Sequence, residues 1–456
     1  MRCSTAITAA AVTASLVLLV SCSSSGDSAS STASSAASAP VSAPATASGN
    51  PSVSTGAAAS GSASTGAEPG YVAAVSAAVQ KVMQDNVIPG SVVLIASADR
   101  GDWTGTFGTG TIGEQAPVTV ADHFRIGSNT KTMTSTVILQ LVQEGKLALD
   151  DTIGKYIPGV PNGDQITIAQ LSEMRSGLYS YSFDPGFNQT LDEQPQKAWT
   201  PQELIDIAFK YPVNFAPGTT FEYSNTNIIL LGMVIEKLTG MTASQAFDER
   251  IFKPLGMQNT LLPLPDDASI PSPHPQGYSF GSNTSTIDTY ALPAADQSAA
   301  LAGTLLPNNE TDANPSWTWT AGGAISTVDD MKTYVEALVD GGLLNAQTQK
   351  VRIDSIQPTG PNSSADAGYG LGIAKFGPLI GHDGQIPGYM TFMGHDPGTG
   401  LTIVIATNLA TVPTGEGSAL QILKGLLPIF YPNISLPADP AAAPAGGASS
   451  TATSTG

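Results

Sequence analysis

The two ends of this chain contain too few apolar side chains to fold. Residues 23 to about 68 are nearly all Ser, Ala, Thr, Gly and Pro, and residues 433–456 repeat that composition. Such segments bury too little apolar surface to offset the conformational entropy that is lost on ordering. A folded domain is therefore expected only within residues 69–432, which suffice for one large domain or a domain in two parts.

The first residues have the pattern of a bacterial export signal. Arg2 precedes an apolar run, residues 6–20, that is too short to span a membrane. The following Ser21-Cys22 completes a segment that resembles a lipobox, where cleavage would leave a lipid on Cys22; an ordinary signal with an incidental cysteine is the alternative. We expect residues 1–21 to be the signal, residues 22–68 to be a tether, and the protein to be exported and lipid-anchored to the outer face of the cell membrane.

Composition excludes several kinds of site and partner. The two cysteines are Cys3 and Cys22, and Cys3 leaves with the signal, so neither an internal disulfide nor a cysteine-based zinc site is expected. The four histidines include no i,i+4 pair, and we expect no metal and no other cofactor. The 37 acidic residues exceed the 18 basic ones, and a net charge of −19 repels nucleic acid and anionic lipid headgroups.

Strand patterns lie at both ends of the foldable chain and helical patterns lie in its middle. In chain order the expected elements are a helix within 68–90, two strands within 91–113, a helix from near Ser128, helical blocks between about 150 and 310, a helix capped by Ser326 or Thr327, strands between 369 and 409, and a helix over about 415–427. This order predicts an α+β fold, an αβα sandwich. Its antiparallel sheet would be flanked by the terminal helices, with an all-α insertion forming the other wall of a cleft.

Ser128 and Lys131 lie one turn apart at the start of an uncharged helical segment. Residues three positions apart share a helix face, and no charged residue follows between Thr132 and Gln143. A serine hydroxyl needs a neighbouring base to become a nucleophile. A lysine in apolar surroundings has a lowered pKa and can serve as that base. Taken alone, the pair is explained more simply as a helix cap followed by an exposed lysine.

Two further motifs follow in the chain. Tyr223-Ser224-Asn225 precedes a helix, and a tyrosine oxygen beside an ammonium can accept and return a proton. Alone, this motif is explained by a turn with Asn225 or Thr226 as the helix cap. His382-Asp383-Gly384 lies on a predicted strand, where a glycine would let a substrate approach the backbone. Alone, it is explained as structural.

The order of the three motifs is more specific than any one of them. Ser-x-x-Lys, then Tyr-x-Asn, then His-x-Gly resembles the signature of the serine β-lactamase/D-alanyl-D-alanine carboxypeptidase superfamily, in its class-C-like branch. The resemblance covers about residues 75–430 and is strongest to secreted actinobacterial carboxypeptidases. It implies a penicillin-recognising serine hydrolase, carboxypeptidase-like or β-lactamase-like, that acts on a peptidoglycan stem peptide, a β-lactam or a small acyl ester.

The resemblance also implies a role for each matching residue. Ser128 would be the acylated nucleophile, and Lys131 would be its base or would hold Tyr223 as the phenolate base. His382 would be catalytic and, with Gly384, would line the strand side of the cleft. The remaining roles are for substrate: Asn225 would bind its amide, Trp317 in PSWTWTAGG would form an aromatic wall, and the N–H groups of Ser128 and Gln385 would form the oxyanion hole.

Three departures from the family pattern bear on the substrate. The carboxypeptidases usually have Thr-Gly-Thr after the histidine and an arginine on the preceding strand, which bind a terminal carboxylate. Here Asp383 would repel such a carboxylate. The position of the arginine is occupied by Ala374-Lys375, and Lys375 would compensate the charge of Asp383 if its side chain reaches the cleft. Met174 stands where the family often has histidine. These changes favour neutral acyl substrates over D-Ala-D-Ala.

Other functions fit parts of the sequence. Gly277-Tyr278-Ser279-Phe280-Gly281 matches a nucleophile elbow, but neither flank predicts the required strand and helix. An esterase on the same fold remains open. So does a lipid-tethered penicillin- or peptidoglycan-binding protein without efficient turnover.

Overall fold

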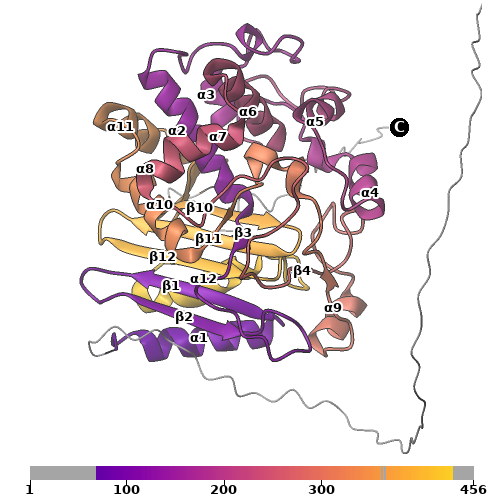
Figure 1. Ribbon diagram of the computed structural model, residues 1–456, viewed down its shortest axis with the longest axis vertical. Helices are drawn as coiled ribbons and strands as arrows, with labels where there is room; N and C mark the ends of the chain where they lie inside the picture. The colour runs from indigo at the N-terminus through magenta and orange to yellow at the C-terminus, as the bar shows by residue number, and fades with distance from the viewer. Residues whose placement is uncertain (1–67, 361–362, 364–365, 435–456) are drawn as a thin grey trace, which may run out of the picture. The chain divides into compact units, whose positions relative to one another are not determined.

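An eight-stranded antiparallel sheet organises the part of the chain that this computed structural model describes, residues 68–360, 363 and 366–434. Its strand order is β2-β1-β12-β11-β10-β9-β8-β7, so the first two strands lie beside the last (Figure 1). The strands are β1 (Gly90–Ala96), β2 (Trp103–Gly108), β7 (Gln357–Pro358), β8 (Ala367–Tyr369), β9 (Ala374–Phe376), β10 (Leu379–Ile386), β11 (Tyr389–Asp396) and β12 (Leu401–Thr407). The predicted sheet, built from both ends of the domain, is confirmed.

Helices cover both faces of the sheet, which explains the unbroken apolar runs of its central strands. Every residue of β1 and β12 is buried, and Val93 pairs with Ile405 between them. Helices α1 (Val72–Asp85) and α12 (Ser418–Phe430) pack together on one face, and the rings of Tyr71 and Phe430 meet edge to face at 5.4 Å (Figure 1). Helix α10 (Val328–Asp340) packs against the other face. The predicted terminal helices are therefore confirmed as a covering layer.

The middle of the chain forms a helical region beside the sheet, as predicted. The helices not yet described are α2 (Thr130–Gln143), α3 (Ile168–Ser172), α4 (Pro185–Glu193), α5 (Pro201–Ala208), α6 (Asn225–Thr239), α7 (Ala243–Phe247), α8 (Lys253–Leu255), α9 (Ala294–Leu301) and α11 (Ala346–Asp354). Helix α6 is at the centre of the helical region: its residues Ile228–Leu231 are fully buried, and it contacts α2, α3, α5 and α7. Within residues 68–360, 363 and 366–434, no helix has the length and apolar character needed to cross a membrane.

Two small sheets connect the helical region to the main sheet. Strand β3 (Phe124–Arg125) pairs with β6 (Ile325–Ser326), and β4 (Tyr278–Ser279) pairs with β5 (Asn308–Asn309). Strand β3 of the first pair ends three residues before Ser128 and contacts β11, so it brings the chain that leads into α2 to the main sheet. The predicted signal, Cys22 and nearly all of both low-complexity ends lie outside the described residues.

The start of α10 agrees with expectation, whereas the start of the last helix, α12, differs from it in detail. Thr327 caps α10, as one of the two predicted alternatives, by accepting the Asp330 N–H at 3.4 Å. The last helix begins three residues later than expected because a bridge between Thr411 and Gly417 keeps the preceding residues in a loop.

The predicted cap of α6 is wrong. Ser224, rather than Asn225 or Thr226, is the N-cap residue. The Asn225 amide instead donates to Ser182 Oγ at 3.2 Å, and the Thr226 hydroxyl donates to the Tyr179 carbonyl at 2.7 Å. Both side chains thus bond to a neighbouring loop rather than to their own helix, which a local pattern could not indicate.

Candidate active site

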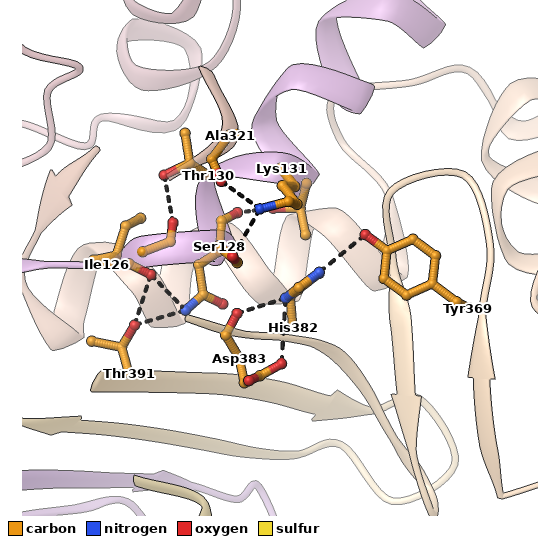
Figure 2. Close-up of polar contacts among 12 residues, drawn as sticks. Ile126, Ser128, Thr130, Lys131, Ala321, Tyr369, His382, Asp383 and Thr391 are labelled. Carbon is orange, nitrogen blue, oxygen red and sulfur yellow. Dashed lines mark hydrogen bonds and ion pairs between the residues drawn. The ribbon is translucent and has the colours of Figure 1, made fainter. Parts of the chain in front are cut away.

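Buried hydroxyl and amide groups hold the turn that carries Ser128. This turn, η1 (Gly127–Asn129), is a 3-10 turn between β3 and α2. On one side the Thr130 hydroxyl donates to the Gly127 carbonyl at 2.8 Å; on the other the Asn129 amide donates to the Thr391 hydroxyl of β11 at 2.7 Å (Figure 2). Asn129, Thr130 and Thr391 are fully buried. The nucleophile's position is therefore set by contacts that solvent does not weaken.

Two glycines allow this turn to lie directly on β10. A Cβ added to Gly384 would overlap the Ile126 carbonyl oxygen and lie 2.9 Å from the Ser128 amide nitrogen. A Cβ added to Gly127, whose φ is 52°, would lie 2.7 Å from the Gln385 amide nitrogen. The expectation that Gly384 makes room for substrate is therefore wrong, because the Ser128 turn fills that space. The same contact brings the backbone around the Ser128 and Gln385 amides together.

Gly384→Ala is expected to lower the free energy of unfolding by about 3 kcal/mol, because its Cβ must push β10 away from rigid backbone. The displaced turn would also slow acylation of Ser128. Denaturant unfolding measures the first effect. Gly70→Ala is the control, because a Cβ there meets nothing within 4 Å. Wild-type stability in Gly384→Ala would contradict the packing described.

Lys131 contacts the nucleophile from a fully buried position. Its Nζ lies 2.8 Å from Ser128 Oγ and 2.7 Å from the Ala321 carbonyl oxygen (Figure 2). Burial lowers the pKa of Lys131 to about 7, and the Asp383 carboxylate partly opposes this shift. A neutral amine in this position can accept the serine proton while it still donates to the carbonyl.

Tyr223 and Asn225 approach the same centre from the helical region. The Tyr223 ring centroid lies 4.8 Å from Lys131 Nζ, and Asn225 is the first residue of α6. Both side chains line the same cavity as Ser128. The structure thus brings together four residues that the sequence spreads over almost a hundred positions.

His382 lies behind the cleft rather than in its wall. Its imidazole is 1% exposed; Nδ1–H donates to the Asp383 carbonyl at 2.6 Å, which leaves Nε2 to accept from the Tyr369 hydroxyl at 3.1 Å. Burial, followed by the charge of Lys131, lowers the pKa of His382 to about 3, so the ring is neutral at pH 7. The expectation that His382 lines the cleft is wrong. Both of its ring nitrogens bond to protein instead of facing the cavity.

A cavity of about 370 Å³ opens over Ser128. Trp317 belongs to its wall, where it was expected, and packs edge to face on Phe187 with ring centroids 5.7 Å apart. Asp383 and Gln385 reach the cavity from β10. Its aromatic lining comprises Phe183, Phe187, Phe221, Tyr223, Phe280, Tyr290 and Trp317.

Lys375 is not brought to this cavity. It lies in β9 with its Nζ 4.0 Å from an Asp366 carboxylate oxygen, and it is absent from the residues that line the cleft within the described chain. The condition on which Lys375 was expected to compensate Asp383, that it reaches the cleft, is therefore not met.

The alternative nucleophile Ser279 does not form an elbow. It ends the two-residue strand β4, and the next residues form a turn with Gly281 at φ 73° instead of a helix. Its hydroxyl accepts the Gly388 N–H at 3.0 Å. The described residues also contain no group of three or more His, Cys, Asp or Glu that could hold a metal ion.

Sequence reasoning missed two serines of the cleft. Ser180 accepts the Asn225 N–H at 3.1 Å, and its hydroxyl lies 2.9 Å from that of Ser182, which bonds the Asn225 amide. Both line the cavity. Their spacing in RSGLYSYS, residues 175–182, was the available signal, but only the tertiary structure aligns them with Asn225. Met174, noted as a departure, is fully buried in this loop and accepts the Glu222 N–H on its carbonyl at 2.9 Å.

Comparisons with known proteins agree with this geometry. Over 339 residues the chain is 27% identical to an Escherichia coli K12 protein named "Putative D-alanyl-D-alanine carboxypeptidase", which covers 67% of this chain and 74% of that protein. It is 29% identical over 187 residues to Protein flp of Staphylococcus aureus, but that match spans only 36% of the relative's length.

A solved structure extends the comparison. The D-stereospecific amidohydrolase from a Streptomyces species is 30% identical and covers 78% of this chain and 99% of its own, with a TM-score of 0.65. The family model described as Beta-lactamase matches residues 75–426. With Ser128 and Lys131 in contact at the centre of its cleft, the chain belongs to the beta-lactamase family of serine hydrolases.

Proposed function

We propose that this protein is a penicillin-recognising cell-envelope hydrolase that forms an acyl-enzyme on Ser128, in the manner of a D-alanyl-D-alanine carboxypeptidase or a β-lactamase. The observation that carries the proposal is the 2.8 Å contact between Ser128 Oγ and the buried Nζ of Lys131 at the base of a cavity. The names of the relatives support D-configured amides or peptides as the substrate class. The apolar start and Cys22 support export and a lipid anchor.

Acylation would proceed by proton transfer and attack. Neutral Lys131 accepts the hydroxyl proton of Ser128 as Oγ bonds to the substrate's carbonyl carbon. The N–H groups of Ser128 and Gln385 stabilise the resulting oxyanion. The proton then passes to the leaving nitrogen or oxygen as its bond to carbon breaks. Water repeats these steps on the ester and releases the acid. Tyr223, beside Lys131, is the alternative base.

Benzylpenicillin provides the direct test. Intact mass of the wild-type protein should rise by the mass of one penicillin, since opening the β-lactam ring expels no atoms. Trypsin cleaves after Arg125 and Lys131, so the adduct should appear on the peptide Ile126–Lys131 and fragment to Ser128.

The decay of the adduct separates the classes of function. Fast decay of the adduct would indicate a β-lactamase, and slow decay would indicate a carboxypeptidase-like enzyme. Decay that is too slow for turnover would indicate a binding protein. No adduct, with p-nitrophenyl ester hydrolysis retained, would indicate an esterase. No adduct and no hydrolysis of esters or D-amino acid amides would overturn the proposal.

The rate of acylation is expected to rise with pH, with its midpoint near pH 7. Lys131, whose pKa is about 7, must lose its proton before it can accept that of Ser128. His382 next to it, with a pKa of about 3, stays neutral throughout this range. Stopped-flow acylation between about pH 5.5 and 9 measures the profile. A rate that does not change across pH 6–8 would contradict Lys131 as the base.

A further inference from the structure

The charged residues that line the cleft all carry the same sign. They are Glu222, Glu310 and Asp383, and within the described chain the lining contains no lysine, arginine or histidine. Lys131 contacts Ser128 but is 0% exposed, and Lys375 lies away from the cleft. A substrate entering this cavity therefore meets a negative field, which its low-dielectric walls strengthen.

Asp383 is the acidic residue nearest the chemistry. It is 6% exposed, lines the cavity from β10, and acts electrostatically on Lys131, whose Nζ lies 2.8 Å from Ser128 Oγ (Figure 2). Lys131 does not cancel its charge during the reaction, because the lysine must be neutral to act as base. The negative charge thus lies in the wall of the cavity that contains Ser128, within electrostatic range of Lys131.

We infer that Asp383 selects acyl donors that carry an ammonium group on the carbon next to the scissile carbonyl, and disfavours acyl donors that are anionic. The inference rests on the proposed acyl-serine function and names its substrate class. An α-ammonium nitrogen is two bonds from the carbonyl carbon, so a carbonyl placed over Ser128 brings it into the cavity that Asp383 also lines. Attraction between opposite charges favours it, and repulsion between like charges disfavours a carboxylate.

Glu222 and Glu310 contribute less directly. Burial raises the pKa of both, and the nearby Asp192 adds to the effect on Glu310. Burial thus destabilises the ionised form of each carboxylate, and an incoming cation would stabilise that form. Glu222 adjoins Tyr223, whereas Glu310 lies across the cleft beside the β10–β11 turn, where its Cβ is 3.6 Å from the position of a Cβ on Gly388. We expect Glu222 and Glu310 to attract a cationic substrate to the cleft, and Asp383 to discriminate between ammonium-bearing and anionic acyl donors.

Three substrates with one leaving group test the inference. D-alanine p-nitroanilide carries the ammonium group, N-acetyl-D-alanine p-nitroanilide is neutral and N-succinyl-D-alanine p-nitroanilide is anionic. At pH 7, kcat/KM of the wild type is expected to fall in that order, by about tenfold at the first step. Asp383→Asn should remove most of this tenfold preference.

The variants include matched controls. Glu222→Gln and Glu310→Gln should lower the preference by only about twofold. Asp354→Asn, which removes an exposed carboxylate on α11, should leave it unchanged. If Asp383→Asn does not fold, the wild type still decides the question, because added NaCl should reduce the preference for the ammonium substrate.

The outcomes separate the inference from the function on which it rests. A penicillin adduct with equal rates on the charged and acetylated anilides, or an unchanged preference in folded Asp383→Asn, would overturn the inference alone. An absent adduct together with no hydrolysis of any anilide or ester would overturn the acyl-serine function itself.

Discussion

Ser128→Ala is expected to abolish the penicillin adduct and to lower kcat/KM for anilide hydrolysis by about 10⁴-fold or more. The variant removes the oxygen that forms the covalent bond, and the methyl group of alanine cannot replace it as a nucleophile. It leaves intact the hydrogen bonds of the turn, which are made by Asn129, Thr130 and Thr391 rather than by Ser128. Intact-mass spectrometry and steady-state hydrolysis measure the two effects.

Ser135→Ala is the matched control for this prediction. Ser135 is a fully buried serine of α2, the helix that follows the Ser128 turn, and it lies outside the cavity lining. It should retain the adduct and most of the activity. Labelling that persists in Ser128→Ala would mean that another residue is the nucleophile, and peptide mapping would then identify it.

Lys131→Met is expected to lower the acylation rate by about 10³-fold or more while it raises the stability of the fold. Methionine keeps the length and apolar character of the side chain but cannot accept the proton of Ser128. The loss should appear in the acylation step at every pH, without the rise near pH 7 that the wild type shows. Rapid-mixing measurements of adduct formation test this.

The gain in stability follows from the sign of the pKa change. Burial lowers the pKa of Lys131 from its ordinary 10.5 to about 7, so the unfolded chain binds the proton more tightly than the folded chain. Stability of the wild type should therefore rise with pH between about 7 and 10.5. Methionine removes this effect, so its advantage should be largest below pH 7 and vanish near pH 10.5.

The size of the gain is the balance of two effects. The full fall in pKa corresponds to at most about 5 kcal/mol, from which the lost hydrogen bonds to Ser128 and Ala321 subtract. We expect a net gain of about 2 kcal/mol by denaturant unfolding at pH 7. Lys81→Met, an exposed lysine on α1, should change neither stability nor activity appreciably. A less stable Lys131→Met protein would show that the lysine's hydrogen bonds outweigh its burial.

Much of the fold followed from local patterns in the chain. Apolar runs predicted the strands that became β1, β11 and β12, because these strands are buried on both faces. Helical spacing predicted α1 and α10. The cap of α6 was not predictable in this way, because Asn225 and Thr226 bond to a loop about 45 residues earlier.

Residue types and their order in the sequence by themselves determined the family of this protein and predicted its site residues. Ser128, Lys131, Tyr223 and Asn225 were identifiable as candidates because a nucleophile and its base need particular functional groups at fixed spacing, and Ser128 and Lys131 lie three positions apart. Only the tertiary structure decided what surrounds them. It turned His382 away from the cleft, filled the space beside Gly384 with the Ser128 turn, left Lys375 outside and placed Asp383 inside. The physical reason is that burial and electrostatic field depend on contacts between segments hundreds of residues apart, which no local pattern specifies.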